Sequence, residues 1–238
     1  MDDFAPVRAE RTFEIIANKV RDQIRDGKLR TGDKLPPERE MAQQLGTSRN
    51  ALREALRSLE HAGLISLHKG ARGGAFITDG NPSAVAQSME DLMHLGGSNL
   101  ADVTEARLSI ETAIVAIAAA KGTITAFDLL DQNIDQVEEL TQARDMDAKA
   151  ALNMEFHVLL AEATGNPVLV LMMRTLMDLL RSVHRPITAE DTADIIKSRR
   201  RFMQLLRNRE AAEAAAEMKD HLSRLHDLFS RTEMPDSG

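Results

Sequence analysis

Four cationic or amide side chains recur at helical spacing in the first third of the chain. They are Arg49, Asn50, Arg53 and Arg57. With about 3.6 residues per turn they share one arc of a helix, while the leucines of the same stretch share another. An α-helix fits the DNA major groove, where arginine pairs with guanine edges and asparagine with adenine. The spacing predicts a helix that packs on a core with one side and reads DNA bases with the other.

Two further helices are expected to hold this one in place. Thr12–Arg25 repeats apolar residues at helical spacing, and Glu38–Leu45 follows two prolines that can open a short second helix. Ser48 is suited to cap the third helix, which is expected to run to about Ala62 and to stop at Gly63.

A glycine-rich hairpin is expected after the third helix. Its strands are predicted at Ile65–His68 and Ala75–Thr78, and the tip between them, Lys69–Gly74, carries two cations and little side-chain bulk. Such a tip can follow a phosphate backbone or enter a minor groove. Helix, turn, helix and basic hairpin in this order predict a winged helix-turn-helix over residues 10–79.

The run from Gly32 to Glu60 resembles the signature of the GntR family of bacterial transcription regulators. It reads GDKLPPEREMAQQLGTSRNALREALRSLE, with Pro37 where many members carry serine. Carried over residue by residue, the resemblance implies that Arg39, Arg49 and Arg53 contact DNA, with Ser48 and Asn50 beside them and Lys69 and Gly70 in the wing.

The rest of the chain predicts an all-helical unit. After a linker at residues 80–83, no convincing strand is found as far as Phe229, and breaks rich in Gly, Pro and Asn separate seven helical stretches. These are expected at about 83–95, 100–121, 124–143, 147–164, 167–185, 190–208 and 210–230. They predict a seven-helix bundle over residues 84–230, followed by a disordered tail at 231–238. The expected fold class is therefore mainly α, with one small β-hairpin in the N-terminal head.

This helical part resembles the FCD ligand-binding domain of the FadR subfamily. The residues that carry the resemblance are Glu105–Glu111, Glu155–His157, Thr164–Asn166 and Met218–Leu222. It implies a dimerisation and effector-binding domain. Many such domains hold a divalent metal through one aspartate and three histidines, and the metal anchors a carboxylate ligand. The corresponding positions here are Asn153, His157, Arg199 and His221.

Two of these four positions carry a different chemistry. Asn153 lacks the negative charge of aspartate, and Arg199 is a cation that cannot coordinate a metal. No cofactor is therefore expected, and any retained divalent metal would depend on His157 and His221. Arg199 is instead expected to pair directly with a carboxylate or phosphate, which its planar guanidinium suits. A shift of register would put Arg200 or Arg201 in that inward position.

Arg107 is a second candidate anchor for an anion, one helical turn before Glu111. The resemblance places it near the ligand cavity. The predicted ligand-binding set is thus Arg107, Asn153, His157, Arg199 and His221. The alternative interpretation is that the histidines are ordinary partly buried residues and that the arginines are solvated.

Charge divides the chain in the same way as the motifs. The net charge is −7, but residues 1–79 carry 14 basic against 12 acidic side chains and the remainder carries 16 against 25. A basic head joined to an acidic body is what a duplex-binding regulator would show. The chain has no cysteine, its first residues do not form a signal peptide, and its apolar runs are too short to cross a bilayer. We expect a cytoplasmic protein with no membrane contact.

The leading functional hypothesis is a homodimeric repressor that binds a palindromic operator and leaves it when a small carboxylated metabolite enters the helical domain. Activation stays open, because the chain encodes binding and not promoter position. A long-chain acyl-CoA effector and a purely dimerising helical domain are the alternatives within the regulator class. An enzyme that uses His157 and His221 as a metal-hydrolase pair is the alternative outside it, but no base or nucleophile accompanies them at a motif spacing.

Overall fold

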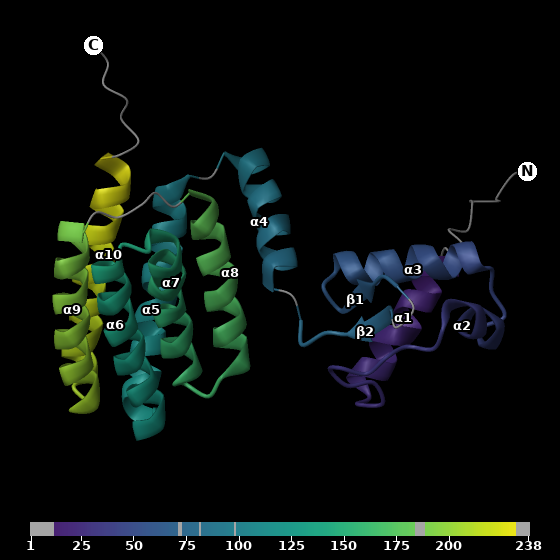
Figure 1. Cartoon of the computed structure of the whole chain (residues 1–238), viewed down its shortest axis with the longest axis horizontal. Coiled ribbons are helices and arrows are strands. Elements are labelled where there is room, and N and C mark those ends of the chain that lie inside the picture. The colour runs from purple at the N-terminus through teal and green to yellow at the C-terminus, as the bar shows by residue number, and fades with distance from the viewer. Residues whose placement is uncertain (1–11, 71–72, 81, 98, 184–188, 232–238) are drawn as a thin grey trace, which may run out of the picture. The chain divides into compact units, whose positions relative to one another are not determined.

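The computed structural model describes residues 12–70, 73–80, 82–97, 99–183 and 189–231 (Figure 1). The chain divides into two compact units, one up to Val85 and the other from Ala86 onward. Helix α4 (Pro82–Gly96) begins inside the predicted linker, because a proline can occupy the first turn of a helix. The domain limits at 10–79, 80–83 and 84–230 stay predictions, and the predicted tail lies outside the described residues apart from Arg231.

Three helices form the frame of the first unit: α1 (Thr12–Arg25), α2 (Glu38–Gln44) and α3 (Arg49–His61). Both α1 and α2 pack against α3, whose apolar arc is buried in their common core. The hydroxyl oxygen of Ser48 accepts a hydrogen bond from the backbone N–H of Ala51 at 3.1 Å, so α3 starts with the predicted cap. The packing leaves the polar arc of α3 in solvent.

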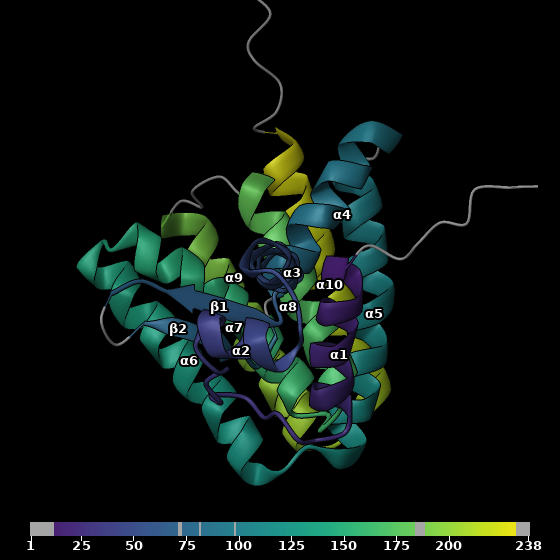
Figure 2. The same ribbon diagram turned by 90° about the vertical axis from the view of Figure 1, so that its right-hand side faces the viewer.

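The hairpin consists of the antiparallel strands β1 (Ile65–His68) and β2 (Gly74–Ile77), which lie side by side in Figure 2. Ile65 stands opposite Ile77, and both side chains enter the core of the head. Glycine is required at position 73, because a Cβ atom there would lie 2.2 Å from the carbonyl oxygen of His68. Ala71 and Arg72 of the predicted basic tip lie outside the described residues.

The segment at residues 33–35, which follows a turn at residues 31–32, continues this small sheet. The Leu35 N–H donates to the carbonyl oxygen of Ala75 at 2.8 Å, and the Ile77 N–H donates to that of Asp33 at 2.9 Å. The sequence predicts only a turn here, because Gly32 and Asp33 are turn residues. The pairing ties the connection between α1 and α2 to the wing.

The second unit confirms the predicted bundle. Over the described residues its helices are α4 (Pro82–Gly96), α5 (Leu100–Lys121), α6 (Ile124–Ala143), α7 (Met146–Glu162), α8 (Pro167–Val183), α9 (Ala189–Arg207) and α10 (Ala211–Arg231). Their bounds lie within two residues of the predicted ones. The mainly α fold with a winged helix-turn-helix head is therefore confirmed.

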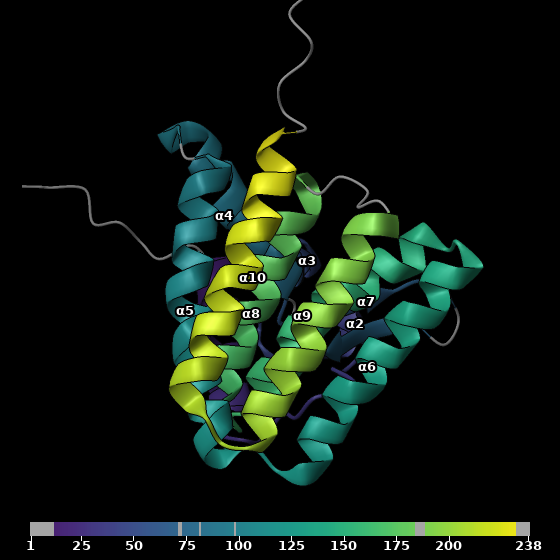
Figure 3. The same cartoon turned by 90° about the vertical axis from the view of Figure 1, so that its left-hand side faces the viewer.

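Helix α5 lies in the middle of the bundle, because it packs against α7, α8, α9 and α10. Helices α9 and α10 run side by side (Figure 3), and α6 packs on both α7 and α9. A helix covered on several sides can place polar residues in the interior only if neighbouring helices satisfy them. Over the described residues, no helix combines the length and the apolar character needed to cross a bilayer.

Candidate functional site

The predicted DNA-contacting residues of the head all lie on its solvent-exposed surface. These are Arg39 on α2, Ser48 before α3, Arg49, Asn50 and Arg53 on α3, and Lys69 and Gly70 after β1. The hydroxyl oxygen of Ser48 already accepts a hydrogen bond from the backbone N–H of Ala51. Its O–H group is therefore the one that can donate to a phosphate oxygen.

Arg53 has a partner that the sequence alone did not indicate. Its Nε donates to the Oε2 atom of Glu38, the first residue of α2, at 2.8 Å. Both side chains remain about half exposed, at 56% and 42%.

The predicted ligand-binding residues come together from four helices inside the second unit. Arg107 lies on α5, Asn153 and His157 on α7, Arg199 on α9 and His221 on α10, and none is more than 7% exposed. Four elements that are distant in sequence thus bring two guanidinium groups, two imidazoles and an amide into the core of one bundle.

Glu111 is the carboxylate of this cluster, and it is completely buried. Its Oε2 atom accepts from Nε of Arg107 at 3.0 Å, and its Oε1 atom pairs with Nδ1 of His157. Burial alone would raise the pKa of the Glu111 carboxyl, but His157 and Arg107 lower it to about 2. Burial lowers the pKa of His157 to about 4 in spite of Glu111. At neutral pH a neutral His157 therefore faces an ionised Glu111.

Arg199 occupies the position where a family metal ligand is expected. Its two terminal nitrogens donate to Oδ1 and to the backbone oxygen of Asn153, at 2.8 and 2.9 Å. The guanidinium carbon also lies 4.3 Å from the ring centroid of Phe156. Burial, and then the like charge of Arg107, lower the pKa of Arg199 to about 9, so the group keeps its charge at neutral pH.

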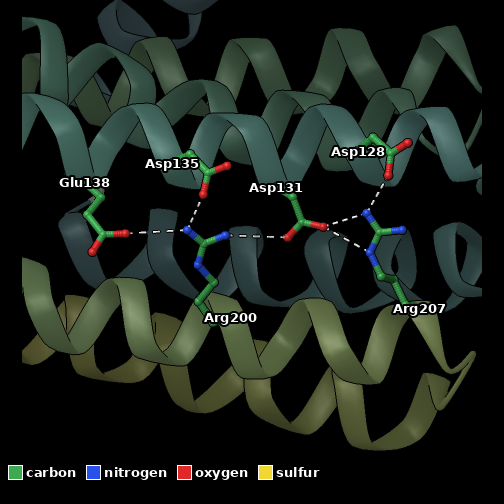
Figure 4. A network of polar contacts seen from close by, with 6 residues as sticks. All are labelled: Asp128, Asp131, Asp135, Glu138, Arg200 and Arg207. Atoms are coloured by element: carbon green, nitrogen blue, oxygen red, sulfur yellow. Dashed lines mark hydrogen bonds and ion pairs between the residues drawn. The ribbon is translucent and has the colours of Figure 1, made fainter.

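The neighbouring arginines of α9 point away from this cluster. Arg200 pairs with Asp135, Glu138 and Asp131 of α6, and Arg207 binds Asp128 and Asp131 at 2.6 Å (Figure 4). Arg201 is exposed and pairs with Glu217 of α10 at 3.2 Å. Of the three consecutive arginines 199–201, Arg199 is thus the one whose side chain is buried, as the predicted register requires.

Several polar atoms of the cluster have no hydrogen-bond partner although they are buried. In the described part of the chain these include Nδ2 of Asn153, Nε of Arg199 and Nε2 of His221. Burial and the charge of Arg199 lower the pKa of His221 well below its ordinary value, so its ring is neutral. A pocket of about 190 Å³ reaches the cluster at His221, between Ile195 of α9 and Leu225 of α10. Buried polar groups without partners are costly, so their concentration here makes this cluster the candidate binding site.

The donor set does not fit a divalent metal. The ring centroids of His157 and His221 lie 6.1 Å apart. Arg199, however, already donates a hydrogen bond to Oδ1 of Asn153 and brings a positive charge to the cluster. Among the described residues, no group of three or more His, Cys, Asp or Glu side chains is arranged to hold a metal ion.

Comparison with protein families matches both units. Residues 12–77 match the model of the bacterial regulatory proteins of the gntR family, and residues 102–224 match that of the FCD domain. A Bacillus subtilis protein, "Uncharacterized HTH-type transcriptional regulator YcbG", is 30% identical over 86% of this chain and 84% of its own. A candidate L-lactate dehydrogenase operon regulatory protein of Escherichia coli is 34% identical over 74% of this chain and 67% of its own.

A solved GntR structure from Streptococcus agalactiae has the same fold, with a TM-score of 0.68 and 23% identity over 90% of this chain and 98% of that one. The two matching families and the relatives named above are transcription regulators and not enzymes, which removes the metal-hydrolase alternative. The chain belongs to the GntR family of bacterial transcription regulators, in the FadR subfamily whose DNA-binding head is followed by an FCD domain.

Proposed function

We propose that this regulator is a homodimeric repressor that leaves a palindromic operator when a small carboxylated metabolite binds the buried cluster without a metal. The observation that carries the effector part is the set of unpartnered polar atoms around Arg199. The DNA part is supported by the exposure of the arginines on α2 and α3.

The charges of the cluster favour an anion. Arg107 and Arg199 are cations, Glu111 is one anion, and both histidines are neutral at pH 7, so one positive charge has no counterpart among these groups. A carboxylate accepts up to about four hydrogen bonds, and the free N–H groups of Arg199 and Asn153 can donate two of them. In the low-dielectric interior a charge-assisted pair of this kind is strong.

His221 is the one member of the cluster that lines the described pocket, and the size of this entrance favours a small acid over an acyl-CoA. At about 190 Å³ it is below the roughly 300–1,000 Å³ of pockets that enclose drug-sized ligands. The name of the Escherichia coli relative, which refers to an L-lactate dehydrogenase operon, agrees with regulation of organic-acid metabolism.

A palindromic operator requires two heads held together, which we assign to a second copy of this chain. In the described part of the second unit, three helices carry exposed large apolar side chains: Met89, Leu92 and Leu95 lie on α4, Ile124 and Leu129 on α6, and Val168, Leu171 and Met172 on α8. We call the six residues on α4 and α8 the apolar face. An uncharged face can pair with its own copy, because an isologous interface uses the same surface twice.

The proposal is tested by operator release. A duplex is first selected from a random pool with the full-length protein, and its binding is followed by fluorescence anisotropy while organic acids are added at moderate salt. A small acid should release the protein and raise its melting temperature, and elemental analysis should find no bound metal. Release only by acyl-CoA, or only after a metal is added, would contradict the effector assignment. No thermal shift with any acid would favour a helical domain that only dimerises.

A further inference from the structure

The ion pair between Glu38 and Arg53 joins the two helices of the DNA-reading unit. The residues are 15 positions apart in sequence, yet Nε of Arg53 and Oε2 of Glu38 lie 2.8 Å apart. Exposed pairs of this kind contribute little to folding stability, because water and salt screen them. The pair can therefore act mainly through the position that it gives to the Arg53 side chain.

Glu38 is held at a fixed place relative to α3. It is the first residue of α2, where the helix dipole favours a negative charge. One turn later Met41 and Ala42 enter the same core as Leu52 and Leu56 of α3. The carboxylate thus extends from one rigid helix to a side chain on the other, so it restricts where the Arg53 guanidinium can point.

Glu38 contacts the Nε edge of the Arg53 guanidinium, which a contact to guanine through the two terminal amino groups does not use. Glu38 accepts from Nε, which leaves both terminal amino groups of Arg53 to form the two-pronged contact with O6 and N7 of a guanine. Ordering a flexible side chain before binding lowers the entropy that is lost when the contact forms. We propose that Glu38 is a positioning residue for Arg53 and that it increases discrimination between operator and other DNA. This inference rests on the proposed base contact of Arg53.

A simple charge effect of Glu38 predicts the opposite change in operator affinity when this residue is removed, which makes the inference testable. A carboxylate next to DNA repels phosphates, so its removal should raise the affinity for every duplex. Glu40 provides the matched control, since it lies two residues further along α2, is exposed, and accepts a hydrogen bond from Gln44 of its own helix at 3.1 Å.

The experiment measures dissociation constants of full-length wild type, Glu38→Ala, Glu38→Gln, Glu40→Ala and Arg53→Ala for the selected operator and for a random duplex at one salt concentration. Glu40→Ala should bind both the operator and the random duplex more tightly. Glu38→Ala should tighten the random duplex but weaken the operator, with discrimination reduced about 3- to 10-fold. Glu38→Gln keeps an acceptor oxygen for Nε and should fall between wild type and Glu38→Ala.

Two outcomes separate failure of this inference from failure of the proposed function. If Arg53→Ala lowers discrimination while Glu38→Ala behaves like Glu40→Ala, the positioning role is overturned. If Arg53→Ala leaves discrimination unchanged, the base contact of Arg53 is wrong and the inference falls with it. If Glu38 acts by positioning Arg53, the double variant Glu38→Ala/Arg53→Ala should discriminate between operator and random duplex as well as Arg53→Ala alone. Circular dichroism of each variant checks that the fold is intact.

Discussion

The arginines assigned to DNA in the head and the arginines of the buried cluster in the body lie in opposite surroundings. Arg49 and Arg53 are exposed on α3, whereas Arg107 and Arg199 are at most 7% exposed within the bundle. An exposed guanidinium acts on a polyanion through a contact that salt weakens. A buried one has lost its water and binds whatever anion completes its hydrogen bonds. Under the proposed function, the same side chain reads DNA in one unit and senses a small anion in the other.

Removal of the buried guanidinium should have the largest effect. Arg199→Met keeps an apolar side chain against Phe156 but removes the charge and the donors, so effector affinity should fall by about 2–5 kcal/mol. Operator binding without effector should be unchanged. Titration of operator release measures both quantities.

Arg200→Met is the matched control for this substitution. Arg200 is the next residue of α9, but its partners are the partly exposed carboxylates of α6 in Figure 4. The control should change the effector response little, because pairs near the surface contribute about 0–1 kcal/mol. A comparable loss in both variants would show that burial is not what distinguishes the two arginines.

Removal of an exposed guanidinium on the recognition helix should have the next largest effect. Arg49→Ala or Arg53→Ala should lower operator discrimination by about 1–3 kcal/mol, because a base contact is lost. Lys69→Ala should instead weaken all duplexes alike and reduce the slope of affinity against salt, as expected for a phosphate contact. Unchanged operator affinity in both arginine variants would refute α3 as the recognition helix.

Acid should act on the body through its buried histidines. The pKa of His157 falls from 6.5 in the unfolded chain to about 4 in the folded one, so the unfolded state binds more protons between these values. Its contribution to stability is complete above pH 6.5 and is lost as the pH falls toward 4. From pH 6.5 to pH 5 the loss should be about 2 kcal/mol, and His221 acts in the same direction.

Urea unfolding of the full chain, followed by circular dichroism, measures this dependence. In His157→Gln the fall in unfolding free energy between pH 6.5 and pH 5 should be smaller, because the substituted side chain does not titrate. An unchanged slope would mean that His157 has the same pKa in the folded and in the unfolded protein.

Disruption of the apolar face should have the smallest effect on each separate unit, since it changes only how two copies associate. Leu92→Glu should shift the protein toward monomers in sedimentation equilibrium and weaken operator binding at low protein concentration. Ile124→Glu is the control, because Ile124 is 71% exposed on α6, away from α4 and α8 in sequence. Dimers of equal stability in both variants would exclude this face as the interface.

The sequence by itself determined the elements and the family. The two arcs of α3, the Ser48 cap and the prolines before α2 depend on local spacing and on the first turn of each helix, which neighbours in sequence decide. For the same reason the limits of the seven helices of the bundle could be predicted within two residues. The i, i+4 pair of Arg107 and Glu111 was also visible in the sequence.

Only the tertiary structure decided which of these groups meet. Glu111 reaches His157 across 46 residues, and Glu38 reaches Arg53 across 15. Among three consecutive arginines, the packing of α9 against α5, α6 and α10 turns Arg199 inward and leaves Arg200 and Arg201 on acidic partners. Such contacts depend on the rotation and register of whole helices, which the burial of all their apolar side chains fixes together, and no local pattern contains that information.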